Sequence, residues 1–393
     1  HLNPRSGRWV PDHTQLQYHV SSAVAYNVWQ YYQATGDVEF LSFYGATIIL
    51  EVARFWASVA RHDPADDRYH IRGVMGPDEF HDAYPDADHP GLDDNAYTNV
   101  MAAWVLDRAE ATLAALPADR REELLDELEI TDAELARWRA VGSRLALHFH
   151  DDGVLSQFAG YDRLAELDWD AYRAKYGDIH RLDRILEAEG DTPNRYRVSK
   201  QADVLMLFYL LSAPELARII ERLGYRWDRA VIPRTVQYYL DRTAHGSTLS
   251  SVVHAWVLAR TDRTRSWALF EQALESDVDD VQGGTTAEGI HLGAMAGTVD
   301  MVQRCYLGLE MRDDALHLDP CLPDALREVR VRLHYRGQTL RVHATRDAVT
   351  VTFAHGTTER ARVSVGSETV ELRAGEERRF AVARAARREA VAV

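Results

Sequence analysis

The chemistry that this sequence suggests first lies in a short acidic segment, Gly76-Pro77-Asp78-Glu79-Phe80-His81. Between Gly73 and Asn95 the chain has no Lys or Arg but several carboxylic acids, namely Asp78, Glu79, Asp82, Asp86, Asp88, Asp93 and Asp94. Because crowded negative charge raises the pKa of a carboxyl group, one member of such a group can stay protonated at neutral pH and act as a general acid. Glu79 is therefore a candidate acid for cleaving a glycosidic bond, and the alternative is a solvated acidic loop.

Lysine is rare in this chain, which draws attention to Lys200. Of the 45 basic residues only Lys175 and Lys200 are lysines, so a retained lysine indicates a need for a slim ammonium, although chance explains it equally well. Ser199 precedes an apolar helical run and is a good N-cap, so we expect Lys200 and Gln201 in the first turn of a helix. Their donors and acceptor suit the vicinal hydroxyls of a sugar, whereas an exposed helix start explains them without a ligand.

The segment His245-Gly246-Ser247-Thr248-Leu249-Ser250 has the composition of an anion site. Gly246 lets a ligand approach the backbone closely, the hydroxyls of Ser247 and Thr248 donate hydrogen bonds, and a helix start offers unpaired N–H groups. Capping by Ser or Thr alone explains half of this segment. His245 is the residue that capping does not require.

A second helix start of this kind runs from Gly283 to His291. We expect Thr286 to cap the helix and His291 to lie one turn in, facing the same mouth as the other helix starts. Glu288 is either a second catalytic carboxylate or an acid that the helix dipole favours.

No zinc-type spacing, phosphate-binding P-loop, dinucleotide fingerprint or serine elbow occurs in the sequence. We therefore expect no metal and no redox cofactor. Cys305 and Cys321 are too few for a disulfide framework, which favours a reducing cytoplasm.

Helices in series must position these segments. Apolar residues recur with a 3.6-residue period at about 14–34, 38–61, 95–115, 131–149, 199–212, 214–223, 228–241, 248–262, 264–276 and 287–306. The span 151–196 is less regular, with short helical pieces between Gly and Pro. Helices of this length joined by functional loops favour a barrel of paired helices with a pocket at one rim.

The period changes to two after about residue 313. Alternating segments at 329–335, 339–342, 349–353, 361–365 and 369–372 are separated by Gly-containing turns and predict a small antiparallel β domain. The expected domains are thus a helical domain over 1–312 and a β domain over 313–383, followed by a frayed tail over 384–393.

The net charge of -16 and the pI near 5.5 argue against nucleic acid or an anionic membrane as partner, since both require a basic surface. The longest strongly apolar run, Val204 to Leu211, is much shorter than a membrane helix, and no signal segment opens the chain. We therefore expect no membrane span.

Six motifs in this order resemble glycoside hydrolase family 65, the inverting phosphorylases of maltose, trehalose, kojibiose, nigerose and related disaccharides. The resemblance rests on His1 to Gly7, Gly76 to His81, Asp94-Asn95-Ala96-Tyr97-Thr98-Asn99, Lys200-Gln201-Ala202-Asp203-Val204, His245 to Ser250, and Thr286 to Gly297, followed by Asp319 to Pro323. It implies an (α/α)6 barrel with a β-sandwich domain before it and a small β-sandwich domain after it.

The resemblance also implies roles for individual residues. Glu79 is the general acid, Lys200 and Gln201 hold the glucosyl unit, and phosphate binds to the helix start with His245, Gly246, Ser247 and Thr248, near His291. Glu79 would protonate the glycosidic oxygen while phosphate attacks the opposite face, giving β-glucose 1-phosphate by inversion. Inorganic phosphate is thus a co-substrate, and no other cofactor is implied.

Compared with the family, the chain lacks the first barrel helices and the N-terminal β-sandwich domain, with their glucose-contacting residues. We expect a missing part of the same polypeptide or a companion chain to complete the site, and this segment alone to be unstable or inactive. A cytoplasmic homodimer is also expected.

Two other functions compete with phosphorolysis. An inverting α-glucoside hydrolase on the same fold would need a carboxylate base for water, and the segment from Thr243 to Ser251 has no Asp or Glu. An inactive sugar-binding or assembly subunit is more remote, because Glu79 and Lys200 are both retained. A helical-barrel epimerase would require a histidine pair and no anion site.

Overall fold

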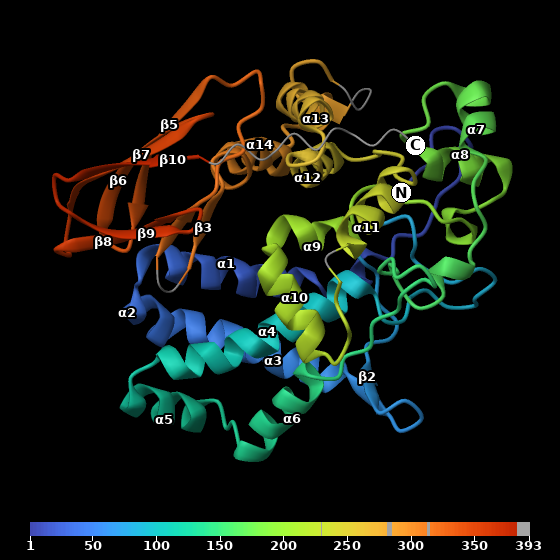
Figure 1. The fold of residues 1–393 in the computed structure, drawn as a ribbon. Helices are drawn as coiled ribbons and strands as arrows, with labels where there is room; N and C mark the ends of the chain where they lie inside the picture. The colour runs from blue at the N-terminus through green and yellow to red at the C-terminus, as the bar shows by residue number, and fades with distance from the viewer. Residues whose placement is uncertain (229, 281–284, 313–314, 383–393) are drawn as a thin grey trace.

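The chain folds into a helical body followed by a small β domain (Figure 1). The computed structural model describes residues 1–228, 230–280, 285–312 and 315–382, so the predicted tail at 384–393 lies outside the described residues. The expectation of a mainly helical chain that ends in a β-sandwich domain is confirmed.

The longer helices follow the apolar period seen in the sequence. They are α1 (Val20–Thr35), α3 (Ala46–Val59), α4 (Ala96–Ala115), α5 (Ala118–Glu127), α6 (Asp132–Gly142), α10 (Ala213–Arg222), α11 (Val231–Leu240), α12 (Thr248–Leu258), α13 (Arg263–Glu275) and α14 (Leu292–Asp300). Shorter helical pieces are η1 (Thr14–Leu16), α2 (Val38–Phe40), η2 (Leu41–Gly45), η3 (Tyr161–Arg163), α7 (Trp169–Tyr176), α8 (Leu182–Glu189), η4 (Pro193–Arg195), α9 (Val204–Leu210), η5 (Thr285–Glu288) and η6 (Met301–Tyr306). Helix α5 was not predicted because nearly all of its residues are charged or small and only Leu124 is buried.

Helix α4 is the central helix of the body. It is buried nearly all round, and α1, α3, α6, α9 and α10 pack against it. Its start is fixed by Asn95, whose Oδ1 accepts a hydrogen bond from the backbone N–H of Thr98 at 2.9 Å. The start of α4 is therefore fixed, and Gly76 of the acid segment packs directly against Asn95.

Two predicted helices have different bounds in the structure. The helix expected over 131–149 ends at Gly142, because the chain then pairs with Tyr69, whose N–H donates to the carbonyl of Arg144 at 2.9 Å. The helix expected over 199–212 begins only at Val204, so the prediction that Ser199 caps it is wrong. Ser199 pairs instead with Thr243 in a parallel bridge, and Lys200 and Gln201 lie in a bend before the helix.

One helical segment among the described residues, Val38–Val59, is long and apolar enough to cross a membrane by length and composition alone (22 residues, mean hydropathy 1.2). This segment contains no long continuous apolar run, because Glu39, Glu51 and Arg54 interrupt its apolar positions. The longest such run in the sequence, Val204 to Leu211, therefore lies elsewhere. Half of its apolar stretch is buried inside the structure, where α3 packs on α1 and α4, so core packing accounts for its composition.

The β domain has two four-stranded sheets, of order β10-β7-β6-β5 and β3-β4-β8-β9. The strands are β3 (Leu309–Met311), β4 (Leu316–Leu318), β5 (Glu328–Tyr335), β6 (Gln338–Thr345), β7 (Ala348–Gly356), β8 (Arg360–Val365), β9 (Glu368–Arg373) and β10 (Glu377–Ala381), and a separate hairpin pairs β1 (Arg61–Asp63) with β2 (Arg68–His70). Neighbouring strands are antiparallel except β4 and β8, which are parallel. Alternation places Val342, Val351 and Phe353 on a buried face, as the period of two predicts.

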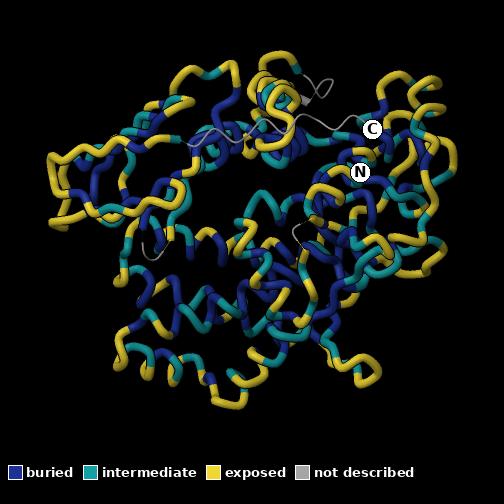
Figure 2. Tube along the Cα trace, in the orientation of Figure 1, coloured by how far each residue is buried: buried dark blue, intermediate teal, exposed yellow. Residues whose placement is uncertain are grey.

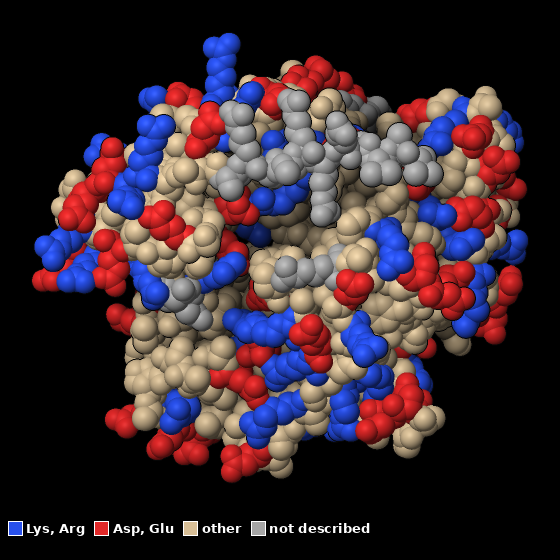
Figure 3. All heavy atoms as spheres, viewed as in Figure 1, with Lys and Arg blue, Asp and Glu red and all other residues tan. Residues whose placement is uncertain are grey.

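The buried residues form separate clusters that support the site (Figure 2). One fills the helical body, and a second joins α12, α13 and η6 to the β domain. A small third cluster lies behind the acid segment and contains Phe80, Leu167, Leu182, Leu186, Val198 and Ala244. On the face shown in Figure 3, acidic and basic side chains are interspersed rather than separated into large patches of one sign.

Candidate active site

The acid segment is held in a constrained conformation. Val74 and Leu92 pair across its base, with N–H to carbonyl distances of 3.0 and 2.8 Å. Glu79 has a φ of 64°, in the left-handed region that residues other than glycine rarely adopt. Such backbone strain is tolerated where the surroundings impose it, and it concentrates at functional sites.

Glycine is required at position 76. A Cβ there would lie 2.3 Å from Oδ2 of Asp203 and 2.4 Å from Nδ2 of Asn95. The absence of a side chain therefore lets the acid segment pack directly on the start of α4 and on the Lys200 segment.

The structure brings Lys200 and Gln201 to Glu79. The Lys200 Nζ lies 2.6 Å from Oε2 of Glu79, and their side chains are 20% and 34% exposed. Gln201 donates from Nε2 to the carbonyl of Pro77 at 2.5 Å. The predicted acid and the predicted sugar-binding residues thus form one group at a partly exposed surface.

Backbone pairing brings the His245 segment to the same group. Ala244 donates its N–H to the carbonyl of Ser199 at 2.8 Å, and Gly246 donates to the carbonyl of Lys200 at 2.8 Å. A Cβ on Gly246 would lie 2.6 Å from the carbonyl oxygen of His180 and 3.0 Å from Cγ of Lys200. Gly246 is therefore the point at which the predicted anion segment contacts Lys200.

The start of helix α12 is capped by a side chain and also presents polar groups. Ser247 caps the helix, with its Oγ accepting from the N–H of Leu249 at 3.3 Å, while Thr248 is buried in the first turn. His245 has a φ of 57°, and its Nδ1 lies 2.8 Å from Oγ of Ser250. Its ring meets His254 edge-on, with centroids 4.6 Å apart.

Both histidines are neutral at physiological pH. Burial lowers the pKa of His245 to about 3, and His254, His180 and Arg265 add to this as nearby positive or potentially positive groups. Burial lowers the pKa of His254 to about 4. A neutral His245 contributes a polar ring to this helix start without bringing a buried charge.

These two histidines predict how stability depends on pH. Below the ordinary histidine pKa of about 6.5, the unfolded chain binds protons that the folded chain does not bind, so the free energy of unfolding falls as pH falls. The loss continues to pH about 4 for His254 and about 3 for His245, at up to about 1.4 kcal/mol per pH unit for each group. Urea unfolding at several pH values measures this slope.

The variant His254→Gln provides the comparison for that slope. It removes one of the two titrating groups, so its stability should depend less steeply on pH than that of the wild-type protein. An equal slope in the two proteins would contradict the assignment of His254 as a neutral buried group.

His291 lies at the start of α14, which packs on α12. Glycines permit this packing, since a Cβ on Gly293 would lie 3.0 Å from Cδ2 of Leu249 and one on Gly297 would lie 2.8 Å from Cγ1 of Val252. His291 precedes the helix as its N-cap residue rather than lying one turn in, and its Nδ1 is paired with Oδ1 of Asp277 at 2.5 Å. The start of α14 therefore lies beside the start of α12.

The structure corrects the predicted role of Thr286 and does not describe the side chain of Glu288. Thr286 was expected to cap the helix that carries His291, but it lies in the 3₁₀ turn η5, separate from α14. The side chain of Glu288 lies outside the described residues.

Sequence reasoning missed several buried polar residues around Glu79: His19, Asp78, His81, Asn95, Gln157 and Asp203. The pKa of His19 is lowered by burial, while a hydrogen bond to the carbonyl of Met75 and the charge of Glu79 oppose this, so His19 lies close to the acid. Asp78, His81 and Asp203 stood inside the quoted motifs and could have been proposed. His19 and Gln157 carry no such signal.

The part of the chain that the structure describes contains no group of three or more His, Cys, Asp or Glu residues arranged to hold a metal ion.

Comparison with known families identifies the helical body. Residues 1–300 match the glycosyl hydrolase family 65 central catalytic domain. The chain belongs to glycoside hydrolase family 65. Residues 309–372 match the C-terminal domain of the same family, which agrees with the β domain seen in the structure.

Relatives support the family 65 assignment. An uncharacterized glycosyl hydrolase of Mycobacterium tuberculosis is 54% identical over 95% of this chain and 28% of its own length. Trehalose 6-phosphate phosphorylase of Lactococcus lactis is 39% identical over 87% of this chain and 43% of its own length. Kojibiose phosphorylase of Halothermothrix orenii is 31% identical, over 86% of this chain and 41% of that protein.

A solved structure supports the family 65 fold. The putative kojibiose phosphorylase from human microbiome superposes with a TM-score of 0.75 at 22% identity, covering 96% of this chain and 52% of that chain. The chain therefore has the fold of this relative, and it spans less than half the length of the curated relatives named above.

Proposed function

We propose that the protein catalyses inverting phosphorolysis of an α-linked glucose disaccharide to β-glucose 1-phosphate and glucose or another acceptor. Curated family 65 relatives that are disaccharide phosphorylases support this reaction class. The observation that carries the proposal is the meeting of two segments at Lys200. Its ammonium holds Glu79 at 2.6 Å, and its carbonyl accepts from Gly246 of the predicted anion segment at 2.8 Å.

Glu79 acts as the general acid. A carboxylic acid at the partly exposed position of Glu79 can reach the glycosidic oxygen of a bound disaccharide and protonate it as the bond to the leaving sugar breaks. In the structure Lys200 is paired with the Glu79 carboxylate at 2.6 Å. When the hydroxyls of the glucosyl unit accept hydrogen bonds from the Lys200 ammonium in place of Glu79, the Glu79 carboxylate can bind the proton that it later donates.

Phosphate acts as the nucleophile from the side of α12. The first turn of this helix offers backbone N–H groups and the hydroxyls of Ser247 and Thr248, next to the neutral ring of His245. Phosphate is already an anion, so no protein base is needed to activate it. The segment from Thr243 to Ser251 has no Asp or Glu, which favours phosphate over water as the nucleophile.

The substitution Gly246→Ala tests the anion side. Its Cβ would collide with the His180 carbonyl oxygen at 2.6 Å and crowd Cγ of Lys200, forcing the two paired segments apart. We expect kcat/KM for phosphate to fall by about 100-fold, since displacements of about 1 Å have effects of that size. Initial rates at varied phosphate concentration measure it, and an unchanged kcat/KM would remove Gly246 from the phosphate site.

We also propose that polypeptide outside this chain completes the glucose site, either from the same polypeptide or from a companion chain. Large apolar side chains are exposed on α1, where Val20 and Val24 are 55% and 46% exposed, and near α14, where Leu292 and Val299 are 74% and 59% exposed. Such faces are suited to contact with further protein. A homodimer and a cytoplasmic location remain predictions.

The substrate is to be identified with the complete protein. The panel comprises maltose, trehalose, kojibiose and nigerose, together with trehalose 6-phosphate because a 39% identical relative is a trehalose 6-phosphate phosphorylase. Each compound is incubated with and without phosphate, and glucose 1-phosphate and glucose are measured. We expect glucose 1-phosphate only when phosphate is present. Equal release of glucose without phosphate would establish the hydrolase instead.

A further inference from the structure

Two buried carboxyl groups lie between the acid segment and the Lys200 segment. Asp78 is 1% exposed and Asp203 is 3% exposed. The backbone N–H of Lys200 donates to Oδ1 of Asp78 at 2.5 Å, and the carboxyl group of Asp203 faces the backbone N–H of Asp78. Each carboxyl group therefore lies against the backbone of the segment to which the other belongs.

The donors around the two carboxyl groups are unequal. Besides the N–H of Lys200, Asp78 accepts from Nδ1 of His81 at 2.9 Å and from Nε2 of Gln157 at 3.1 Å. The Nε2 of His81 lies 2.9 Å from the carbonyl oxygen of Tyr196, so both ring nitrogens of His81 are held by oxygen atoms. The carboxyl group of Asp78 thus has three hydrogen-bond partners.

Asp203 has fewer partners. Its side chain accepts from Nδ2 of Asn95 at 3.0 Å, and it faces the charge of Asp78. Burial, and then the negative charge of Asp78, raise the pKa of Asp203 well above its ordinary value. Two carboxyl groups this close and this deeply buried are stable when one of them keeps its proton.

We propose that Asp78 and Asp203 form a reciprocal carboxyl clamp that positions Glu79 against Lys200. The proposal rests on the proposed function, in which Glu79 is the acid. Both carboxyl groups are buried and act on the backbone around Glu79, so we assign both as positioning residues. The clamp explains how Glu79 keeps its left-handed conformation, since the two residues that precede it, Pro77 and Asp78, are fixed to the Lys200 segment.

Two substitutions at position 203 test the clamp in the complete protein. Asp203→Ala removes the acceptor for the Asp78 N–H, and we expect kcat to fall by about 100-fold because the acid is displaced. Asp203→Asn keeps an acceptor and the neutral state, so kcat should stay close to the wild-type value. A wild-type kcat in Asp203→Ala, with Glu79→Gln inactive, would overturn the clamp and leave the proposed function intact.

A stability measurement tests the neutral state of Asp203 even if Asp203→Ala does not fold. The folded protein keeps a proton that the unfolded chain loses above its ordinary pKa, so this group stabilises the fold at low pH, and that stability is lost as pH rises. Asp203→Asn lacks this loss, and its stability relative to wild type should therefore increase with pH. A constant difference across the pH range would contradict a neutral Asp203.

A different observation concerns the junction between the helical body and the β domain. Cys305 lies in η6, at the end of the helical body, and Cys321 follows β4. The N–H of Cys321 donates to the carbonyl of Tyr306 at 2.8 Å, and the Cys321 thiol donates to the carbonyl oxygen of Cys305 at 3.4 Å. Both are free in the structure, and both are buried in the cluster that joins the two domains.

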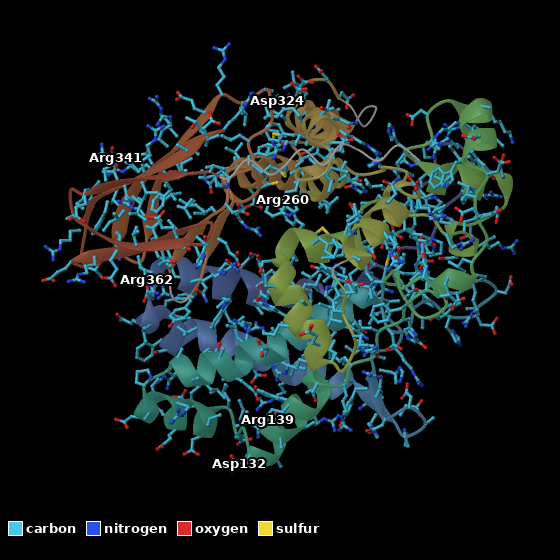
Figure 4. All side chains as sticks on the ribbon, in the orientation of Figure 1. Asp132, Arg139, Arg260, Asp324, Arg341 and Arg362 are labelled. Atoms are coloured by element: carbon cyan, nitrogen blue, oxygen red, sulfur yellow. The ribbon has the colours of Figure 1, made fainter. Side chains whose placement is uncertain are left out.

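The two thiols have different environments. The neighbouring Cys305 thiol, together with the nearby charges of Arg260 and Arg263, lowers the pKa of Cys321. The neighbouring Cys321 thiol and burial raise the pKa of Cys305. Arg260, labelled in Figure 4 at this junction, is held by Asp319 at 2.9 Å. Cys321 is therefore the more acidic thiol of the pair.

We infer that Cys305 and Cys321 form a disulfide on exposure to a peroxide, tying the end of the helical body to the segment that leads into the β domain. The Cys321 thiolate attacks the peroxide and becomes a sulfenic acid, while the O–O bond breaks and one oxygen leaves as water. The Cys305 sulfur then attacks the Cys321 sulfur and loses its proton, and the second oxygen leaves as water. Two thiols are oxidised and one peroxide is reduced.

Mass spectrometry of the protein treated with hydrogen peroxide, under non-reducing denaturing conditions, tests this pair. We expect the loss of two hydrogens and a peptide that links Cys305 to Cys321, both reversed by a dithiol reductant. Cys305→Ser should instead accumulate oxygen on Cys321. Two unmodified thiols in the treated wild-type protein, or oxygen addition without the linked peptide, would overturn the inference.

Discussion

Glu79→Gln is expected to abolish phosphorolysis of ordinary disaccharides, raising the barrier by about 3 kcal/mol or more. Glutamine has nearly the same shape as glutamic acid, but its amide cannot give a proton to the glycosidic oxygen. The leaving sugar would then depart as an alkoxide, which is the step that general acid catalysis avoids. Initial rates of glucose 1-phosphate formation measure the effect.

A substrate that needs no acid separates loss of catalysis from loss of structure. Glucosyl fluoride carries a good leaving group, so Glu79→Gln should keep most of its activity on this donor in the presence of phosphate. Asp82→Asn is the matched control, because Asp82 lies in the same acidic segment but is paired with His13 at 2.8 Å. Near-normal turnover of disaccharide by Glu79→Gln would remove Glu79 from its role.

Lys200→Met should have the second largest effect. The substitution removes the ammonium that is 2.6 Å from Glu79 and that we propose transfers to the glucosyl hydroxyls. Hydrogen bonds to charged groups contribute about 1.5–3 kcal/mol, so kcat/KM for the disaccharide should fall by at least tenfold. Lys200→Arg should not restore it, because the planar guanidinium is wider than the ammonium.

The chain provides a control for this variant in its one other lysine. Lys175 is exposed and paired with Glu189, away from the acid segment, so Lys175→Met should leave kcat/KM unchanged. If Lys200→Met and Lys175→Met had the same activity, Lys200 would not be part of the glucose site.

The sequence predicted the elements that obey a simple period. Helix α3 and strands β5 to β7 could be placed because their apolar residues repeat with a period of 3.6 or two, and burial of one face follows from that repeat. Strand β10 was missed because it is short and only Phe380 is buried in it. Local pattern carries little information about such an edge strand.

The predicted start of the helix after Lys200 was wrong for a different reason. Ser199 has the residue type of an N-cap, but tertiary pairing with Thr243 takes its backbone into an extended bridge instead. That pairing is what brings Lys200 to Gly246 and the two halves of the site together. No local pattern predicts a contact between segments so far apart in the chain.

The same limit applies to the residues around the acid. Glu79, Lys200 and His245 were proposed separately, and only the resemblance to family 65 suggested that they share a site. Asp203 was inside a quoted motif but received no role, since its importance depends on burial next to Asp78, which the sequence does not reveal.

We propose above all that one acid, Glu79, and one bound anion carry out the reaction by inversion. The most direct test follows the complete protein and its best disaccharide by proton and phosphorus NMR, in the presence and absence of phosphate. We expect that the first-formed product is β-glucose 1-phosphate and that no sugar is released without phosphate. First formation of the α-anomer, or release of glucose without phosphate, would contradict it.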